Sequence, residues 1–382
     1  MNPGLKILAD ENIPALEALF GDLGELRRLP GRNLSAADVA DVDILLVRSI
    51  TRVDETLLGN AAVKFVGTAT IGTDHLDTRR LDERGIRWCS APGCNADAVV
   101  EYVLSALWHL CAEREMDPLG LTVGVVGAGN VGGRLVARLR ALGVEVLVCD
   151  PPRAAREGSE GFVELEQLLA SADLVALHTP LTRGGDHPTH HLLNQSNLGL
   201  LKPEAILLNA GRGPVIDNRA LTEFMQRRTD LQLVLDVWED EPLVQPELAA
   251  QCAIATPHIA GYTLDGKIRG TWMLYREVCS WLGRPAAVTL DSVLPEPEVA
   301  ALAVNGSVDP LRPIALVYDP YRDDRALRRT LYLPPTERMA AFDRLRKEYP
   351  VRREFSSLRI DGLEDEGQVE LLGNLGFSAV IA

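Results

Sequence analysis

Residues 122–135 read Thr-Val-Gly-Val-Val-Gly-Ala-Gly-Asn-Val-Gly-Gly-Arg-Leu. An apolar, β-prone run is followed here by the pattern Gly127-x-Gly129-x-x-Gly132 and then by a helix-like segment. This order predicts a strand, a tight turn and a helix whose N-terminus binds the pyrophosphate of a dinucleotide. Gly127 would permit the turn, Gly129 would let the backbone approach the pyrophosphate, and Gly132 would let the helix lie close to the strand.

The next predicted strand, residues 144–149, ends on an acidic residue, Asp150. An acid at this place accepts hydrogen bonds from the adenosine ribose, which favours NAD over NADP. Because Arg153 and Arg156 follow closely, NADP stays open as the alternative cofactor.

The composition is that of a globular protein: 46% of the 382 residues are hydrophobic and 24% are charged. This length predicts two or three domains with ample core. The formal net charge of −15 argues against nucleic acid and anionic membranes as main partners. An anionic substrate must therefore be drawn in by a locally basic site.

The six cysteines are scattered along the chain without a C-x-x-C pair. Several lie in apolar runs, so we expect reduced, buried thiols rather than disulfides or metal ligands. Residues 1–10 lack the long apolar segment of a secretory signal, and no uninterrupted apolar run approaches the length that spans a bilayer. These features predict a cytoplasmic protein without a membrane partner.

Strand-like and helix-like segments alternate along most of the chain. In the first hundred residues we expect strands at 5–9, 44–47 and 64–68, and then a helix at about 97–111. Further strands are expected after Thr122 and at 144–149, 174–177, 205–209, 231–236 and 253–256, with a helix at about 265–282. Such alternation predicts doubly wound parallel sheets. Pro295-Glu296-Pro297-Glu298 is typical of a linker, and a third, small domain is expected after it.

Three polar residues follow predicted strands in the second half of the chain: Arg212, Glu241 and His258. In a doubly wound domain such loops converge on the crevice that holds the nicotinamide. An Arg there can clamp a carboxylate through two parallel hydrogen bonds. A His can accept the proton of a hydroxyl group while a hydride leaves the same carbon, and a neighbouring Glu would stabilise the imidazolium and raise the pKa of the His. Together these residues indicate oxidation of a hydroxy acid.

Residues 1 to about 285 resemble the D-2-hydroxyacid dehydrogenases, and the Arg, Glu and His motifs are specific to that family. The resemblance implies that Arg212 clamps the substrate, that Glu241 is the partner of His258, and that His258 is the general acid and base. The segment before the Arg usually reads Asn-Ala-Ser-Arg-Gly in this family, or has Cys in place of Ser. Gly211 departs from this pattern, which affects only the expected local packing.

A more specific resemblance extends over nearly the whole chain, to a group of these dehydrogenases that has an extra C-terminal domain. It is carried by residues 8–14, 47–49, 67–75, 91–95 and 258–262, and by Tyr318-Asp319 and Leu345-Arg346-Lys347. It implies oxidation of a small phosphorylated 2-hydroxy acid on the way to pyridoxal 5′-phosphate, by a homodimer joined through the C-terminal domain.

The implied fold is α/β, with two doubly wound Rossmann-like domains and a small α+β C-terminal dimerisation domain. The substrate domain is discontinuous and comprises residues 1–95 and 266–288. The NAD-binding domain, residues 96–265, is inserted into it, and the dimerisation domain covers residues 289–382.

The same resemblance implies the residues of the binding sites. Ser49, Thr70 and Tyr262 would contact the substrate. Besides the three glycines of the turn, the cofactor site would be lined by Asn130, Val131, Asp150, Thr179, Ala210, Gly211, Asp236 and Gly261.

The substrate phosphate needs a cation, and Arg48 is the candidate in the first hundred residues. Arg346, Arg352 and Arg353 of the C-terminal domain are the alternatives, although such Arg clusters more often lie on a solvated face. His187, His190 and His191 lie in a polar segment without companion ligands at metal spacing, so we interpret them as part of a surface loop or helix start. No metal is expected, since hydride transfer requires none.

Two other functions stay open at the level of the sequence. The same chemistry could act on another 2-hydroxy acid, such as 3-phosphoglycerate. A protein of this fold could also be an NAD(H)-sensing binding protein, like the co-repressor relatives of the family. The acidic charge balance weighs against that second alternative.

Overall fold

The computed structural model describes residues 4–382, and their contacts divide the chain into two compact units. The first unit comprises the described part of Met1–Asn95 together with Thr263–Glu296. The second unit comprises Ala96–Tyr262 and Pro297–Ala382. The first unit is thus formed by two segments that lie far apart in the sequence. The finer division into three domains stays a prediction, because residues 297–382 group with the dinucleotide-binding segment.

The first unit is built on a five-stranded parallel sheet with the order β2-β1-β3-β4-β5. Its strands are β1 (Leu5–Asp10), β2 (Gly24–Leu29), β3 (Ile44–Val47), β4 (Phe65–Thr68) and β5 (Arg87–Cys89). Its helices are α1 (Leu16–Phe20), α2 (Ala36–Val39), α3 (Glu55–Leu58), α4 (Thr78–Glu83) and α11 (Leu264–Trp281).

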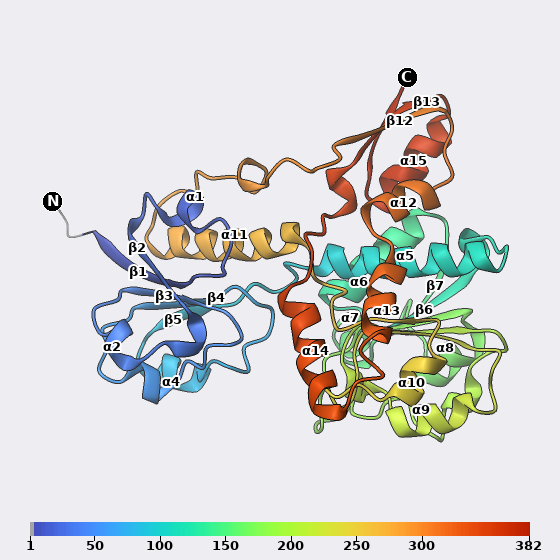
Figure 1. Ribbon diagram of the computed structural model, residues 1–382, viewed down its shortest axis with the longest axis horizontal. Helices are drawn as coiled ribbons and strands as arrows, with labels where there is room; N and C mark the ends of the chain where they lie inside the picture. Colours follow the sequence, from blue (N-terminus) through green and yellow to red (C-terminus); the bar gives the residue numbers. More distant parts are fainter. Residues whose placement is uncertain (1–3) are drawn as a thin grey trace. The chain divides into compact units, whose positions relative to one another are not determined.

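Both faces of this sheet are covered, which explains why its central strands are continuously apolar. On β3, Ile44 and Leu46 belong to a core that includes α1 and α11, whereas Leu45 and Val47 face a second core with α2, α3 and α4. Figure 1 shows α1 and α11 on one side of the sheet and α2 and α4 on the other. The alternation of strand side chains thus produces the predicted doubly wound arrangement.

The second unit contains a six-stranded parallel sheet with the order β11-β10-β9-β8-β6-β7. The strands are β6 (Thr122–Val126), β7 (Glu145–Cys149), β8 (Leu174–Leu177), β9 (Ile206–Asn209), β10 (Gln232–Leu235) and β11 (Ile254–Ala255). The helices between Ala96 and Tyr262 are α5 (Ala96–Glu113), α6 (Asn130–Ala141), α7 (Pro151–Glu157), α8 (Leu165–Ser171), α9 (Asn218–Met225) and α10 (Pro246–Gln251).

The strand order reverses direction at β6, because β7 lies on one side of it and β8 on the other. Ligands of open α/β sheets bind outside the carboxyl ends of the strands at such a switch point. The loop that follows β6 is the glycine turn at Gly127–Gly132. Topology therefore places the turn where a dinucleotide is expected to bind.

The C-terminal segment adds a third, three-stranded parallel sheet with the order β12-β13-β14. Its elements are β12 (Ala301–Gly306), α12 (Leu311–Val317), α13 (Pro320–Arg328), α14 (Pro335–Lys347), β13 (Arg359–Leu363), α15 (Glu366–Leu375) and β14 (Ser378–Ile381). Ile314 and Phe355 extend the core around α5, and Leu327 and Phe342 extend the core on the opposite face of the six-stranded sheet. This shared packing is why the segment groups with the second unit.

Two strands that the sequence did not predict, β2 and β5, form the edges of the first sheet. β2 reads Gly-Glu-Leu-Arg-Arg-Leu and exposes its charged side chains, so it lacks the apolar signal of a buried strand. The strands that the sequence did predict match observed strands to within about two residues at each end. Within residues 4–382, no helix combines the length and apolarity needed to cross a membrane.

Candidate active site

The glycine turn has the geometry that its sequence predicts. Gly127 adopts a left-handed φ of 86°, and a Cβ at this residue would lie within 3.0 Å of His178 backbone atoms. At Gly132, a Cβ would collide with the carbonyl oxygen of Gly127, so only glycine lets α6 lie this close. At Gly129, by contrast, a Cβ would meet nothing within 4 Å. This open side fits the close approach of a ligand to the backbone.

The N-terminus of α6 presents backbone donors toward that open side. Its N-cap residue is Gly129, and no side chain caps the helix. Asn130 is exposed and Val131 is half-buried in the first turn. Uncapped N–H groups at a helix N-terminus, with the positive end of the helix dipole, fit the pyrophosphate of a dinucleotide.

Asp150 follows β7 and is fixed beside the glycine turn. Its carboxylate accepts hydrogen bonds from the backbone N–H of Ala128 at 2.8 Å and of Arg153 at 2.9 Å. Arg153 in turn donates to the carbonyl of Ala128 and to Glu157. Arg153, the cation that kept NADP open as a cofactor, therefore already has partners in the protein. Asp150 therefore lies beside the glycine turn, and its contact with a ribose stays a prediction.

The three predicted catalytic residues follow three adjacent strands of the second unit. Arg212 comes after β9, Glu241 after β10 and His258 after β11, and these strands are neighbours in the sheet. Since the carboxyl ends of parallel strands meet at one edge, the three loops share that edge with Thr179 after β8 and the glycine turn after β6. A dinucleotide lying along the edge would run from Asp150 toward the catalytic residues.

His258 and Glu241 form a hydrogen-bonded pair with 2.7 Å between Nδ1 and Oε2. The second oxygen of Glu241 accepts the backbone N–H of Trp238 at 2.8 Å. Because an ionised carboxylate only accepts hydrogen bonds, Nδ1 of His258 carries the proton. In the neutral ring, Nε2 is then the nitrogen with the lone pair, which is the state that a general base requires.

Asp236 is buried and organises the loop that carries His258. One carboxylate oxygen accepts the hydroxyl of Thr256 at 2.7 Å and the N–H of Ile259 at 2.8 Å, and the other accepts the N–H of Ala260 at 2.9 Å. Its carbonyl accepts the N–H of His258 at 2.7 Å. The cofactor contact that the family resemblance implies for Asp236 stays a prediction, and the contacts that the structure shows hold the loop of His258.

Arg212 is exposed in a loop whose backbone is held by Asn209. The Asn209 side chain donates to the carbonyl of Arg212 at 3.0 Å and accepts the N–H of Gly211 at 3.1 Å. At Gly213 a Cβ would collide with the backbone of Trp238. Hydrogen bonds before Arg212 and close packing after it hold the loop, and the exposed side chain of Arg212 can reach a ligand.

The residues before Arg212 explain the departure from the family pattern. Ala210 is half-buried and packs against the core. A Cβ at Gly211 would lie 3.1 Å from the carbonyl oxygen of Leu177 and 3.4 Å from that of Thr179. The space for a side chain at position 211 is small, so glycine fits there, and its presence does not require a different position for Arg212.

Tyr262 and Gly261 end the catalytic loop beside the C-terminal segment. The ring of Tyr262 packs edge-on against Tyr349, with 5.7 Å between centroids, and Arg346 lies 5.7 Å from the centroid of the same ring. Gly261 is half-buried. The C-terminal segment thus supports Tyr262 directly.

Arg352, a sequence candidate for binding phosphate, has a different role. It is buried, and its terminal nitrogens donate to the carbonyls of Ala98 and Ala260 at 2.8 and 3.1 Å. Its guanidinium also lies 3.7 Å from the centroid of the Tyr318 ring. Arg352 therefore holds the His258 loop to α5 and is not available to a substrate. Sequence reasoning missed this role because an Arg cluster carries no signal of burial.

The predicted substrate residues of the first unit follow two adjacent strands. Arg48 and Ser49 come directly after β3, and Thr70 comes after β4. Arg48 Nη1 lies 4.0 Å from Oδ1 of the buried Asp10, which ends β1. The hydroxyl of Thr70 is 2.7 Å from that of Thr68 and donates to the carbonyl of Gly72. These residues share one edge of the first sheet.

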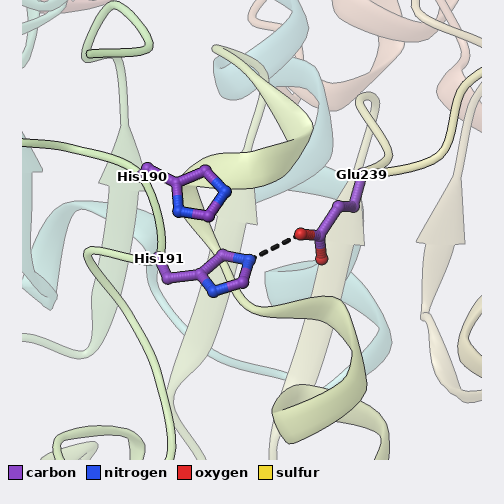
Figure 2. Close-up of side chains that lie close together, drawn as sticks. All are labelled: His190, His191 and Glu239. Atoms are coloured by element: carbon purple, nitrogen blue, oxygen red, sulfur yellow. Dashed lines mark hydrogen bonds and ion pairs between the residues drawn. The ribbon is translucent and has the colours of Figure 1, made fainter. Parts of the chain in front are cut away.

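His190, His191 and Glu239 form a cluster whose candidate ligand atoms lie within 4.8 Å of one another (Figure 2). His191 Nε2 is 2.5 Å from Glu239 Oε1, and its Nδ1 is 3.7 Å from Asp217. The two imidazole rings are stacked, with centroids 4.0 Å apart and 22° between their planes. A metal must lie in the plane of each ligating ring, and stacked rings direct their lone pairs side by side rather than to one point. We interpret the cluster as a hydrogen-bonded group that supports its loop, with no metal assigned.

Two family models match parts of the chain. Residues 99–260 match the family model described as D-isomer specific 2-hydroxyacid dehydrogenase, NAD binding domain, which confirms NAD as the predicted cofactor. Residues 293–376 match a domain of unknown function, DUF3410.

Relatives and solved structures extend the agreement beyond this domain. TT0316 protein from Thermus thermophilus is 29% identical, with a TM-score of 0.60, and the match covers 74% of this chain and 99% of that one. D-Lactate dehydrogenase from Aquifex aeolicus, complexed with NAD and lactic acid, is 25% identical, with a TM-score of 0.56 and coverage of 73% and 96%. Erythronate-4-phosphate dehydrogenase of Pseudomonas aeruginosa is 54% identical over 371 residues, 96% of this chain and 97% of that protein. The chain therefore belongs to the erythronate-4-phosphate dehydrogenases, within the D-isomer specific 2-hydroxyacid dehydrogenase family.

Proposed function

We propose that this chain oxidises 4-phospho-D-erythronate with NAD to 2-oxo-3-hydroxy-4-phosphobutanoate, a step towards pyridoxal 5′-phosphate. The observation that carries the proposal is the 54% identity to a relative of that name over 96% of the chain. Arg212, Glu241 and His258 at the ends of three adjacent strands support it chemically.

His258 is the general base of the proposed reaction. Its Nε2 takes the proton of the C2 hydroxyl, and the imidazolium that forms is stabilised by Glu241 at 2.7 Å from Nδ1. The N–H of Trp238 holds Glu241 in place, so the ring orientation is set before the substrate binds.

Arg212 binds and orients the acid. A guanidinium can donate two parallel hydrogen bonds to the C1 carboxylate and polarise the adjacent C2 oxygen. As the hydroxyl loses its proton, negative charge develops on that oxygen, and the nearby cation stabilises it.

The glycine turn, the uncapped N-terminus of α6 and Asp150 would hold NAD, which supplies an acceptor for the hydride that leaves C2. Thr179, Ala210 and Gly211 follow β8 and β9 between this turn and the catalytic residues, so they are proposed to line the same cofactor. Gly261 is assigned to this site by the family resemblance.

Ser49, Thr70 and Tyr262 are proposed as further substrate contacts. Ser49 is exposed, and Thr70 and Tyr262 are half-buried. Hydroxyl groups at these positions suit a substrate rich in hydroxyl and phosphate oxygens. Arg48 is proposed to bind the phosphate.

A homodimer and a cytoplasmic location belong to the same proposal. Of the exposed large hydrophobic residues among 4–382, the majority lie in the C-terminal segment: Val299, Leu316, Tyr332, Met339, Val351, Val380 and Ile381. Such a concentration supports an interface there. All six cysteines are unpaired thiols, which supports a reducing compartment.

The proposal is tested by the purified protein's formation of NADH from 4-phospho-D-erythronate, followed at the absorbance of NADH. A panel with 3-phosphoglycerate, D-lactate and D-glycerate gives the comparison. We expect kcat/KM to be highest for 4-phospho-D-erythronate. A higher value for another acid would reassign the substrate, and tight NADH binding without any turnover would favour a sensing role.

A further inference from the structure

A second cation of the first unit lies beside Arg48. This residue is Lys267, in the first turns of α11, the helix that returns to the first unit after the cofactor-binding segment. Sequence reasoning did not single it out, because a lone Lys in an amphipathic helix usually lies on a solvated face. The Lys267 side chain is exposed, so a ligand can reach it, although the packing around its ammonium group partly desolvates that group.

The packing of α11 on β4 gives the position of Lys267. The side chain of Leu274 packs over Gly67, and Gly270 lies over the carbonyl oxygen of Ala69. Four residues of helix advance about 6 Å and two residues of strand advance about 6.6 Å, so helix and strand run side by side at the same rate. Lys267 precedes Gly270 by three residues on the same helix face, about 4.5 Å further along. It therefore projects past the end of β4, over the loop that begins at Thr70.

The register of the sheet brings Arg48 to the same place. Val47 pairs with Thr68, so Arg48, the next residue, lies opposite Ala69. Ala69 is the residue against which Gly270 packs. The pairing of β3 with β4 and the packing of α11 on β4 thus place Arg48 and Lys267 at the same part of the carboxyl edge of the first sheet.

The positive charge of Arg48 affects the pKa of Lys267, as expected for two neighbouring cations. The pKa of the Lys267 ammonium is lowered from its ordinary value, first by desolvation and then by the positive charge of Arg48. Like charges held together repel, and a bound dianion relieves that repulsion. The buried carboxylate of Asp10, 4.0 Å from Arg48 and hydrogen-bonded to the N–H of Asn12, orients the Arg from beneath.

We propose that Lys267 and Arg48 form a phosphate-binding pair at the carboxyl edge of the first sheet, and that this pair selects a phosphomonoester substrate. Arg48 supplies a planar fork of donors and Lys267 a compact point charge, two complementary ways of holding phosphate oxygens. The hydroxyl of Thr70 lies at the same edge, where it donates to the carbonyl of Gly72. This inference rests on the proposed function, since it assigns the phosphate end of that substrate.

The test compares the full-length Lys267→Gln and Arg48→Gln variants with the wild type on 4-phospho-D-erythronate and on unphosphorylated D-erythronate. Lys64→Gln is the matched control. Lys64 belongs to the same unit but immediately precedes β4, at the opposite end of the strand, where it pairs with Asp43 at 2.7 Å. All four proteins are first compared by thermal unfolding, so that a loss of fold is recognised.

We expect Lys267→Gln to raise KM for the phosphorylated substrate about 10- to 100-fold, as for loss of a charge-assisted hydrogen bond, with little change in kcat. Its kcat/KM for D-erythronate should change less than about threefold, and Lys64→Gln should resemble the wild type. Equal losses on both substrates, or no loss on either, would overturn the proposal.

Inorganic phosphate separates this inference from the proposed function. It should inhibit the wild type competitively with the phosphorylated substrate and raise the thermal midpoint, and both effects should weaken in Lys267→Gln but not in Lys64→Gln. If no acid were oxidised, the proposed function would fail, while a Lys267-dependent rise in midpoint would still support the phosphate site. Turnover with a rise in midpoint independent of Lys267 would sink the inference alone.

Discussion

His258, the proposed general base, is held in an unfavourable backbone conformation. Its φ is 57°, in the left-handed region that a residue with a Cβ adopts at a cost of about 1–2 kcal/mol. The surrounding hydrogen bonds to Asp236, from the N–H groups of His258, Ile259 and Ala260, offset that cost. The conformation directs the ring towards Glu241, so the strain is coupled to the geometry of the pair.

Glu241 and Glu239 form a natural pair of test and control. Both are acids of the same loop, but Glu241 binds His258 and Glu239 binds His191. We expect Glu241→Gln to lower kcat about 10²–10⁴-fold, because an amide can donate to Nδ1 and stabilise the wrong tautomer of the base. Glu239→Gln should leave kcat within a few-fold of the wild type. Steady-state kinetics checks this, and equal kcat values for the two variants would contradict the role of Glu241.

His178 follows β8 and makes stability depend on pH. Its Nε2 is shielded from solvent without a hydrogen-bond partner among residues 4–382, and burial lowers the pKa of His178 to about 4. An unfolded His titrates near 6.5, so between these values the unfolded chain binds a proton that the folded chain does not. The stabilisation is fully present above about pH 6.5 and is lost as the pH falls towards 4, by at most about 1.4 kcal/mol per pH unit.

The measurement is the urea midpoint at about pH 7 and pH 5 for the wild type and His178→Gln. The difference between the two pH values should be smaller in the variant, which has no group to protonate there. If the wild type and the variant lost the same stability on acidification, other groups would be responsible.

At the scale of elements, two glycines of the turn before α6 are expected to serve different purposes, one in packing and one in binding. Gly132 is required by the contact of α6 with the turn, whereas a Cβ at Gly129 would meet nothing within 4 Å, so Gly129 is proposed to leave space for the cofactor. We expect Gly132→Ala to lower the thermal midpoint and weaken NADH binding together, since its Cβ would collide with Gly127. Gly129→Ala should weaken NADH binding with a much smaller loss of stability. Thermal unfolding and fluorescence titration with NADH check both, and similar losses of stability in the two variants would contradict this division.

The edge strands of the first sheet are elements that the sequence alone did not predict. β3, β4, β8 and β9 are apolar along their length because both faces are covered, and such runs are recognisable. β2 is recognisable only through its pairing with β1, since its outward side chains are charged. An edge strand of this kind adopts its extended conformation because it pairs with the neighbouring strand, and the sequence of the edge strand alone does not reveal that pairing.

At the scale of the molecule, the C-terminal segment acts as a support for the catalytic loop within the second unit. Arg352 ties Ala260 to α5, the buried Glu101 accepts the N–H of Phe355, and Asp324 accepts the N–H of Ala255 on the edge strand β11. The segment therefore covers the strand after which His258 follows.

Arg352→Met tests this support. It removes donors from two buried carbonyls and the cation beside Glu101, and breaking such a buried network costs about 3–5 kcal/mol. We expect a lower urea midpoint and a lower kcat, because the Ala260 loop carries His258. Arg359→Met, which removes an exposed Arg paired with Asp361, is the control and should change neither. A stable Arg352→Met variant with wild-type kcat would show that the loop needs no such support.

The sequence by itself indicated the glycine turn, the positions of the buried strands along the chain and the three candidate catalytic residues. Gly127, Gly129 and Gly132 have a local meaning, because backbone conformation and close approach depend on a few adjacent residues. Arg212, Glu241 and His258 could be named because each follows a strand whose apolar run is visible in the sequence.

The tertiary structure decided what depends on contacts between distant segments. It placed Arg352 in the interior rather than at a substrate, gave Asp236 the task of holding a loop, and aligned Lys267 with Arg48 through the packing of α11 on β4. In each case the role of a polar side chain follows from burial and from the register of an element far away in the chain. Neither burial nor register can be read from the neighbouring residues in the sequence, because an Arg or Lys in a solvated helix can have the same sequence neighbours as a buried one.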